Sequence, residues 1–205
     1  MATPSETSVA NACLTLLGER RINDLEENSK TANVLKERFD EVRDSLLRRH
    51  PWNFATKRIS IAKDVAAPVW GFDNQYTLPA DLLRLLNVEN PNHWPYTVEG
   101  RKVVTDLESP LEVVYTGRIT AVDQMDVLFR QALAAELAAD VAESITGDDQ
   151  KVNTLQQIVA GKIREARNTD GQETSPRNIE SSEWLDAREE QGLVRNVPTG
   201  GGTPL

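Results

Sequence analysis

Apolar residues recur at helical spacing in two segments near the start of the chain. Within residues 9–17 the apolar positions lie three and four apart, which predicts a short amphipathic helix that ends at Gly18. The same spacing recurs in residues 32–46, with charged residues on the opposite side, and predicts a second, longer helix. This helix should end at His50-Pro51, because the residue before a proline is disfavoured in the α region.

The period of the pattern then changes to two. Apolar and polar residues alternate in residues 55–61 and again in residues 111–116, as they do in half-buried strands. Between these segments, the stretch YTVEGRKVV at 96–104 predicts a hairpin that turns at Glu99-Gly100. Residues 53–118 are therefore expected to form a small antiparallel β unit.

Helical spacing returns after this unit. Asp126 is a suitable N-cap for an alanine-rich helix whose apolar residues recur from 129 to 145, and Gly147 should end that helix. The apolar residues within 152–166 predict a fourth helix.

The order of these elements predicts an α+β fold. Two helices in 1–52 and two in 119–169 would form a four-helix body, with the antiparallel β unit of 53–118 inserted between the second and third helices. From residue 170 the composition shifts to polar residues, Gly and Pro, so 170–205 should form an extended C-terminal tail with a short helix near 181–190. Tails of this kind often become ordered only on a partner.

Charge is distributed unevenly along the chain. The net charge of −9 at pH 7 argues against a protein that holds DNA by neutralising its phosphates. Residues 43–63 nevertheless carry six basic residues and one acid, a net charge of +5, whereas residues 121–149 carry seven acids and one basic residue, a net charge of −6. These two stretches could attract each other within one subunit or between subunits.

The basic stretch has two interpretations. Trp52 and Phe54 lie among its charges and could stack on bases, as aromatic residues do in proteins that bind single-stranded nucleic acid. Basic residues at the end of a helix also complement its dipole, and both aromatic residues fall where the chain should pack against the sheet. We favour the structural interpretation, in which basic residues of one subunit contact acids of the next. The residues of this predicted subunit contact are Arg48, Arg49, Lys57, Arg58, Asp140 and Glu143.

Residues with catalytic chemistry are sparse. His50 and His93 lie in unrelated contexts, without a spacing that indicates metal ligation or a nucleophile and its base. Cys13 is the only cysteine, which excludes an intrachain disulfide and a cysteine-based metal site and fits a reducing compartment. We therefore predict no catalytic site, no metal and no cofactor. The sequence also lacks an apolar run long enough for a membrane span.

Two pairs of carboxylates are the remaining enzymatic candidates. Asp123 with Asp126, or Asp148 with Asp149, could supply the acid and the nucleophile of a glycosidase. Both pairs fall where helices begin, and acids at such positions cap free N–H groups and complement the helix dipole. Capping is the preferred interpretation.

A series of short motifs occurs in a defined order along the chain. They are HPWNFATKR, QYTLPADLLRLLNV, YTVEGRKVVTD, VVYTGRIT, LFRQALAAELAADVAESITGD and EWLDAR. In this order they resemble the podovirus tail tubular protein A family, whose members are adaptors that join the phage head to the tail. The resemblance covers residues 5–190, and its specificity comes from the order of the motifs rather than from any one of them.

The resemblance implies a structural role in the virion, at the junction of head and tail, after synthesis in the host cytoplasm. The family forms a ring of twelve copies that binds the portal protein on one side and the tail nozzle protein on the other, while DNA passes through the channel. Acids of the third helix or of the tail would then repel phosphates from the channel wall. Within the EWLDAR motif, Trp184, Leu185 and Arg188 would dock on the portal, since Trp and Arg are favoured interface anchors. The alternative is that Trp184 folds back on the helical body of its own chain.

Two other functions stay open at this point. One is a cell-wall glycosidase carried on the virion, which would depend on the carboxylate pairs described above. The other is an adaptor from a tail of another morphology, which only the neighbouring virion proteins would distinguish.

Overall fold

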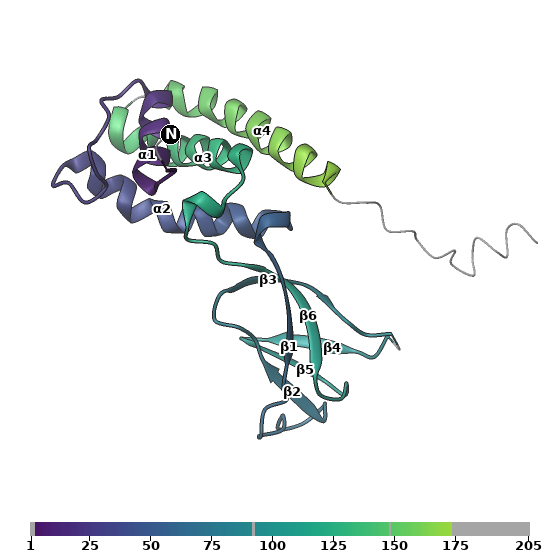
Figure 1. Ribbon diagram of the computed structural model, residues 1–205. Coiled ribbons are helices and arrows are strands. Elements are labelled where there is room, and N and C mark those ends of the chain that lie inside the picture. The colour runs from purple at the N-terminus through teal and green to yellow at the C-terminus, as the bar shows by residue number, and fades with distance from the viewer. Residues whose placement is uncertain (1–2, 92, 148, 174–205) are drawn as a thin grey trace, which may run out of the picture. The chain divides into compact units, whose positions relative to one another are not determined.

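The computed structural model describes residues 3–91, 93–147 and 149–173, without the side chains of residues 149 and 150. Within these ranges the chain has an α+β fold with four α-helices and two three-stranded antiparallel sheets (Figure 1). The predicted fold class is therefore confirmed. The short helix predicted near 181–190 lies outside the described residues.

The helices begin and end at residues whose local chemistry suits those positions. They are α1 (Glu6–Leu17), α2 (Lys30–Arg49), α3 (Val127–Thr146) and α4 (Asp149–Gln172). The side chains of Ser5 and Ser29 accept hydrogen bonds from backbone N–H groups in the first turns of α1 and α2. Gly18 and Gly147 follow α1 and α3 in the left-handed conformation that glycine adopts without strain. As predicted, α2 ends directly before His50, whose backbone is extended.

The last helix, α4, extends past residue 169 into the segment predicted as tail. Asp170 accounts for the difference. Its carboxylate accepts a hydrogen bond of 2.9 Å from the backbone N–H of Asn53, and its carbonyl accepts one of 2.6 Å from Asn53 Nδ2. These contacts come from the segment after α2 and support the last turn of α4. The local sequence around residue 170 contains no sign of them.

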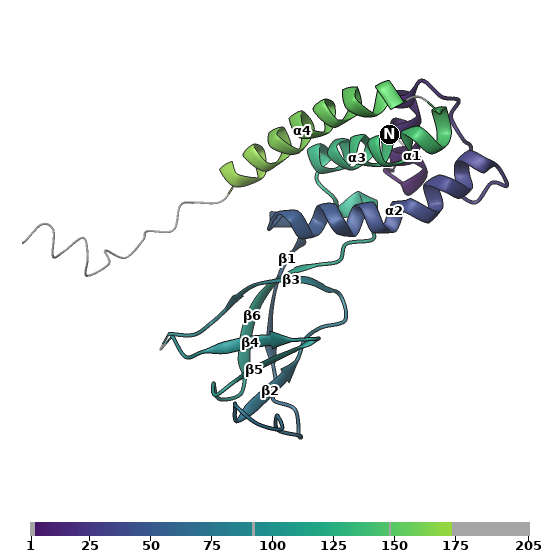
Figure 2. The ribbon, with the colours of Figure 1, turned by 180° about the vertical axis from the view of Figure 1, so that it is seen from behind.

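One hydrophobic core joins the four helices. The alanine-rich α3 lies beside α4 in both views and also packs against α1 and α2 (Figures 1 and 2). Ala132, Ala135 and Ala138 are fully buried, and their small side chains let neighbouring helices approach α3 closely. Among the described residues, no helix combines the length and the apolar composition that crossing a membrane requires.

The β unit consists of two small sheets. Its strands are β1 (Thr56–Ile61), β2 (Asn74–Thr77), β3 (Leu82–Val88), β4 (Tyr96–Glu99), β5 (Lys102–Thr105) and β6 (Leu111–Gly117). Sheet A has the order β1-β6-β3 and sheet B the order β2-β5-β4. Strands β4 and β5 form the predicted hairpin, with Val98 opposite Val103 and Gly100 at positive φ in the turn. Side chains of both sheets share a second hydrophobic core, which contains Tyr76, Leu78, Val88, Val103, Leu111, Val113 and Tyr115.

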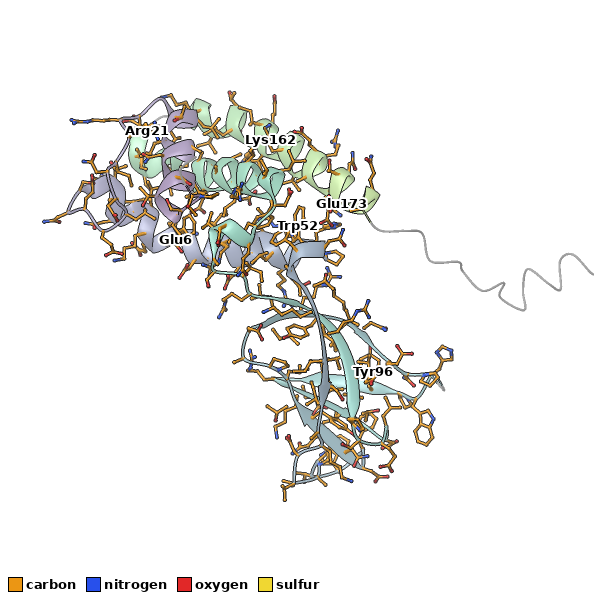
Figure 3. The ribbon with its side chains drawn as sticks, viewed as in Figure 1. Glu6, Arg21, Trp52, Tyr96, Lys162 and Glu173 are labelled. Atoms are coloured by element: carbon orange, nitrogen blue, oxygen red, sulfur yellow. The ribbon has the colours of Figure 1, made fainter. Side chains whose placement is uncertain are left out.

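The aromatic pair after α2 packs against a helix, not against the sheet as the sequence suggested. Trp52 (labelled in Figure 3) is only 1% exposed, and its ring meets Phe129 of α3 edge-on at 5.0 Å between centroids. Phe54 contacts Phe129 at the same distance, and Trp52 Nε1 donates a hydrogen bond to the carbonyl of Leu46. A single 3-10 turn at Asn53–Ala55 keeps both rings with the helices before β1 begins. Trp52 is therefore not available to stack on bases.

Candidate interaction surfaces

Two of the predicted contact residues at the end of α2 have partners in their own chain. Arg49 forms an ion pair with Glu136 of α3. Arg48 donates a hydrogen bond to the carbonyl of Leu83 in β3. The first contact ties α2 to α3 and the second ties α2 to the β unit. A contact of either arginine with a second copy stays a prediction.

Lys57 and Arg58 are neighbours on β1 and project from opposite faces of the strand. Lys57 Nζ lies 2.7 Å from Asp81 Oδ2, and the Tyr115 hydroxyl donates to the same carboxylate at 3.3 Å. Burial would raise the pKa of Asp81, but the hydrogen bond and the charge of Lys57 outweigh it and lower that pKa. Arg58 instead lines a hollow of about 260 Å³ together with Glu112, and it forms no ion pair with another described residue.

The acids predicted to meet these basic residues lie on α3. Asp140 accepts hydrogen bonds of 2.7 and 3.1 Å from Arg38 of α2, and this contact raises the pKa of the Arg38 guanidinium. Glu143, further along α3, is exposed. The structure thus places Asp140 and Glu136 at separate ion pairs between α2 and α3. The contact of Asp140 and Glu143 with a neighbouring copy stays a prediction.

The first carboxylate pair considered for glycosidase chemistry, Asp123 and Asp126, lies just before α3. Asp126 Oδ1 accepts hydrogen bonds of 2.7 and 3.2 Å from the first N–H groups of α3, so the predicted N-cap is confirmed. Asp123 lies in a short 3-10 helix, Val122–Gln124, and is exposed. Asp148 and the side chain of Asp149 lie outside the described part of the chain. Within that part, no group of three or more His, Cys, Asp and Glu side chains could hold a metal ion.

The residues predicted to dock on the portal, Trp184, Leu185 and Arg188, all lie outside the described residues. Their role stays a prediction.

The structure also forms a basic hollow that no local motif indicates. His50 lines it together with Arg164 and Arg167 of α4, and its volume is about 390 Å³. Asp170 Oδ2 lies 3.1 Å from His50 Nε2 and supplies a negative charge. The pKa of His50 is lowered, mainly because the ring is partly buried. The hydrogen bond and the charge of Asp170 raise this pKa, and the positive charges of Arg167 and Arg84 lower it further. Asp170 also accepts a hydrogen bond from the backbone N–H of Asn53, which follows α2. This cluster therefore connects α4 to the segment that leads into the β unit.

Large apolar side chains are exposed in the segment that precedes β2. Val65 and Val69 are 108% and 98% exposed, and Trp70 is 86% exposed. Gly71 follows at φ 92°, a conformation that favours glycine, and bends the chain directly after the tryptophan. An exposed Trp beside two exposed Val residues is typical of an interaction surface. The local sequence, Pro68-Val69-Trp70-Gly71, contains turn-forming residues but no helical or strand periodicity, so periodicity alone does not indicate this surface.

A second exposed apolar row lies in and just before β4. Trp94, Tyr96 and Val98 are 46%, 41% and 46% exposed, and Figure 3 labels Tyr96. Their spacing of two places Tyr96 and Val98 on one face of the strand.

The helical body carries an apolar hollow of about 330 Å³ between α1, α3 and α4. Leu16 and Ile158, which form part of its wall, are 43% and 37% exposed. Lys162 (labelled in Figure 3) lies at its edge and donates a hydrogen bond of 2.8 Å to Gln131. The full lining is Ala12, Thr15, Leu16, Gln131, Ala134, Ala135, Ile158 and Lys162.

Comparison with known proteins finds no family model that matches the chain, and no curated protein matches it. Information on function therefore comes from the motif order and from the surfaces described above.

Proposed function

We propose that this protein is a structural head-to-tail adaptor of the tail tubular protein A type, which forms a ring between a phage portal and a tail nozzle. The order of the sequence motifs supports this function. The observation that carries it is the exposure of large apolar side chains on both parts of the fold, with Trp70 and Tyr96 on the β unit and Leu16 on the helical body. A protein that joins two partners needs an interaction surface for each of them.

The contacts of the basic stretch support a role in which DNA passes through the ring, rather than one in which the protein binds DNA. Trp52 is buried, while Arg49 and Lys57 are paired with acids of the same chain. The net charge of −9 would repel phosphates and let DNA pass through a ring of such subunits without adhering. Submicromolar affinity of the purified protein for duplex DNA at low salt would contradict this part of the proposal.

The role of Asp126 as the N-cap of α3 argues against the glycosidase alternative. Its carboxylate accepts two backbone hydrogen bonds as the cap of α3, whereas a glycosidase needs an acid and a second carboxylate that are both free to act on substrate. A peptidoglycan zymogram tests this directly, and a cleared band at the position of the purified chain would revive the enzymatic function.

Electron microscopy of the chain mixed with its purified portal tests the adaptor function. We expect a ring of density with the symmetry of twelve copies beneath the portal. A chain that lacks residues 183–205 should lose portal binding while its circular dichroism spectrum stays that of a folded protein. Absence of ring density with the full chain would contradict the adaptor function, and unchanged binding of the shortened chain would contradict the docking role of Trp184, Leu185 and Arg188.

A further inference from the structure

Sheet B ends in a strand whose outer side is open. In the order β2-β5-β4, strand β4 pairs with β5 on one side and forms an edge on the other. The outer side of an edge strand presents unpaired N–H and C=O groups, which can pair with another chain. Among the described residues, no backbone hydrogen bond from outside sheet B reaches Tyr96–Glu99.

The other three edges are each protected. On the β2 side, Asp64 N donates to the carbonyl of Gln75 at 2.9 Å, and the Asp64 carboxylate accepts from the N–H of Thr77, so the preceding segment covers this edge. Strand β1 carries the charges of Lys57 and Arg58, and β3 contains two register shifts. Charged residues, irregular pairing and covering segments are the usual means by which proteins block edge-to-edge pairing. Strand β4, with the sequence YTVE and a continuous register to β5, has no Lys, Arg, Pro or bulge, and its one charged residue, Glu99, lies at the hairpin turn opposite Lys102.

The apolar layer of sheet B is also incomplete at β4. Tyr96 lies opposite Thr105 and Val98 opposite Val103, so these side chains share the face that carries Tyr76 of β2. Val103 and Tyr76 are fully buried, whereas Tyr96 and Val98 are 41% and 46% exposed. On this face of sheet B, the apolar side chains of β2 and β5 are therefore buried, whereas those of β4 remain accessible to solvent.

Trp94 continues the row and is held in place before any partner binds. Asn90 Oδ1 accepts a hydrogen bond of 2.9 Å from Trp94 N, and Asn90 Nδ2 donates one of 2.6 Å to the carbonyl of Trp94. An aromatic residue on a fixed main chain loses little conformational entropy on binding. Trp94, Tyr96 and Val98, together with the outer main chain of β4, are called the β4 edge below.

We propose that the β4 edge binds an extended segment of a partner protein as an additional strand of sheet B, with apolar side chains at every second position of that segment. The open main-chain groups select an extended segment, and the exposed row selects apolar side chains beside Tyr96 and Val98. The inference goes beyond the adaptor function, because it depends on the geometry of sheet B whichever protein supplies the segment.

The size of the β4 edge favours a segment over a second copy of this chain. Stable complexes bury roughly 1,200 Å² or more, and a strand of four residues with three side chains offers much less than that. Two copies that met only through β4 would therefore not form a stable dimer. A free peptide on this edge should likewise bind only weakly, whereas a segment that belongs to a larger contact with a partner gains from the rest of that contact.

Nuclear magnetic resonance with a capped synthetic peptide, Lys-Thr-Val-Thr-Val-Thr-Lys, tests the proposal on the full-length, isotope-labelled chain. We expect saturable shifts of the backbone amides of Trp94 and of residues 96–99. Val98→Lys should weaken binding by up to about fivefold, since it removes an apolar cross-strand partner. Thr97→Gln is the control, because Thr97 is exposed on the opposite face of the same strand and glutamine adds no charge to the edge, so this replacement should leave the affinity unchanged.

A second peptide, with proline in place of the central threonine, separates strand pairing from simple apolar contact, because proline cannot donate to a ladder. Loss of binding with this peptide supports the proposal, and equal binding of both peptides overturns it. Absence of shifts at Trp94 and at residues 96–99 overturns it as well. Self-association in sedimentation velocity that Val98→Lys abolishes and Thr97→Gln does not would show that the occupant is a second copy, and would also overturn the proposal.

Discussion

Replacement of Trp52 by alanine tests whether the aromatic residue in the basic stretch belongs to the core. The side chain is 1% exposed, meets His50 and Phe129 edge-on, and donates a hydrogen bond of 3.1 Å to the carbonyl of Leu46. Truncation of a buried Trp to Ala lowers the free energy of unfolding by about 3–5 kcal/mol. The lost hydrogen bond accounts for about 1 kcal/mol of that total. We expect Trp52→Ala to lower the free energy of unfolding by about 4 kcal/mol and the melting temperature by about 8–16 °C.

Urea unfolding followed by circular dichroism measures this change, with calorimetry for the melting temperature. Trp52→Phe keeps most of the buried ring and loses only the indole hydrogen bond and some contact area, so its loss should be about 1–2 kcal/mol. Trp70→Ala is the matched control, since Trp70 is 86% exposed and its removal should change stability by less than about 0.5 kcal/mol. A loss below about 1 kcal/mol for Trp52→Ala would refute its burial in the core and restore the nucleic-acid interpretation.

Three other side chains give further tests. Cys13 is fully buried, and burial raises the pKa of its thiol to about 12, so Ellman's reagent should react with it in guanidinium but not in the native protein; rapid native reaction would contradict this. Burial lowers the pKa of His50 in the folded state, so the unfolded state takes up a proton first and stability falls as the pH drops below about 6.5. His50→Asn should therefore flatten the dependence of the urea midpoint on pH between about 7.5 and 5.5, and an unchanged slope would contradict the shift. Asp126→Ala removes the cap of α3 and should cost about 0.5–2 kcal/mol, whereas the exposed Asp123→Ala should cost little, and equal losses would argue against the cap.

The sequence by itself determined the order of the elements and most of their ends. Pro51 follows the end of α2, Asp126 caps α3, and Gly147 stops α3. The hairpin of β4 and β5 turns at Gly100 as its local sequence predicts. These features depend on the conformational preferences of single residues and on the period of neighbouring side chains, which are local properties of a chain.

The tertiary structure alone decided which distant residues come together. Trp52 packs on Phe129, and Asp170 supports the last turn of α4 through Asn53 and lies beside His50, although no spacing in the sequence links these positions. The open edge of β4 likewise follows from its place at the end of sheet B rather than from its four residues. Such contacts result from the packing of complete elements, and the periodicity of a single segment carries no information about the partner that it will meet.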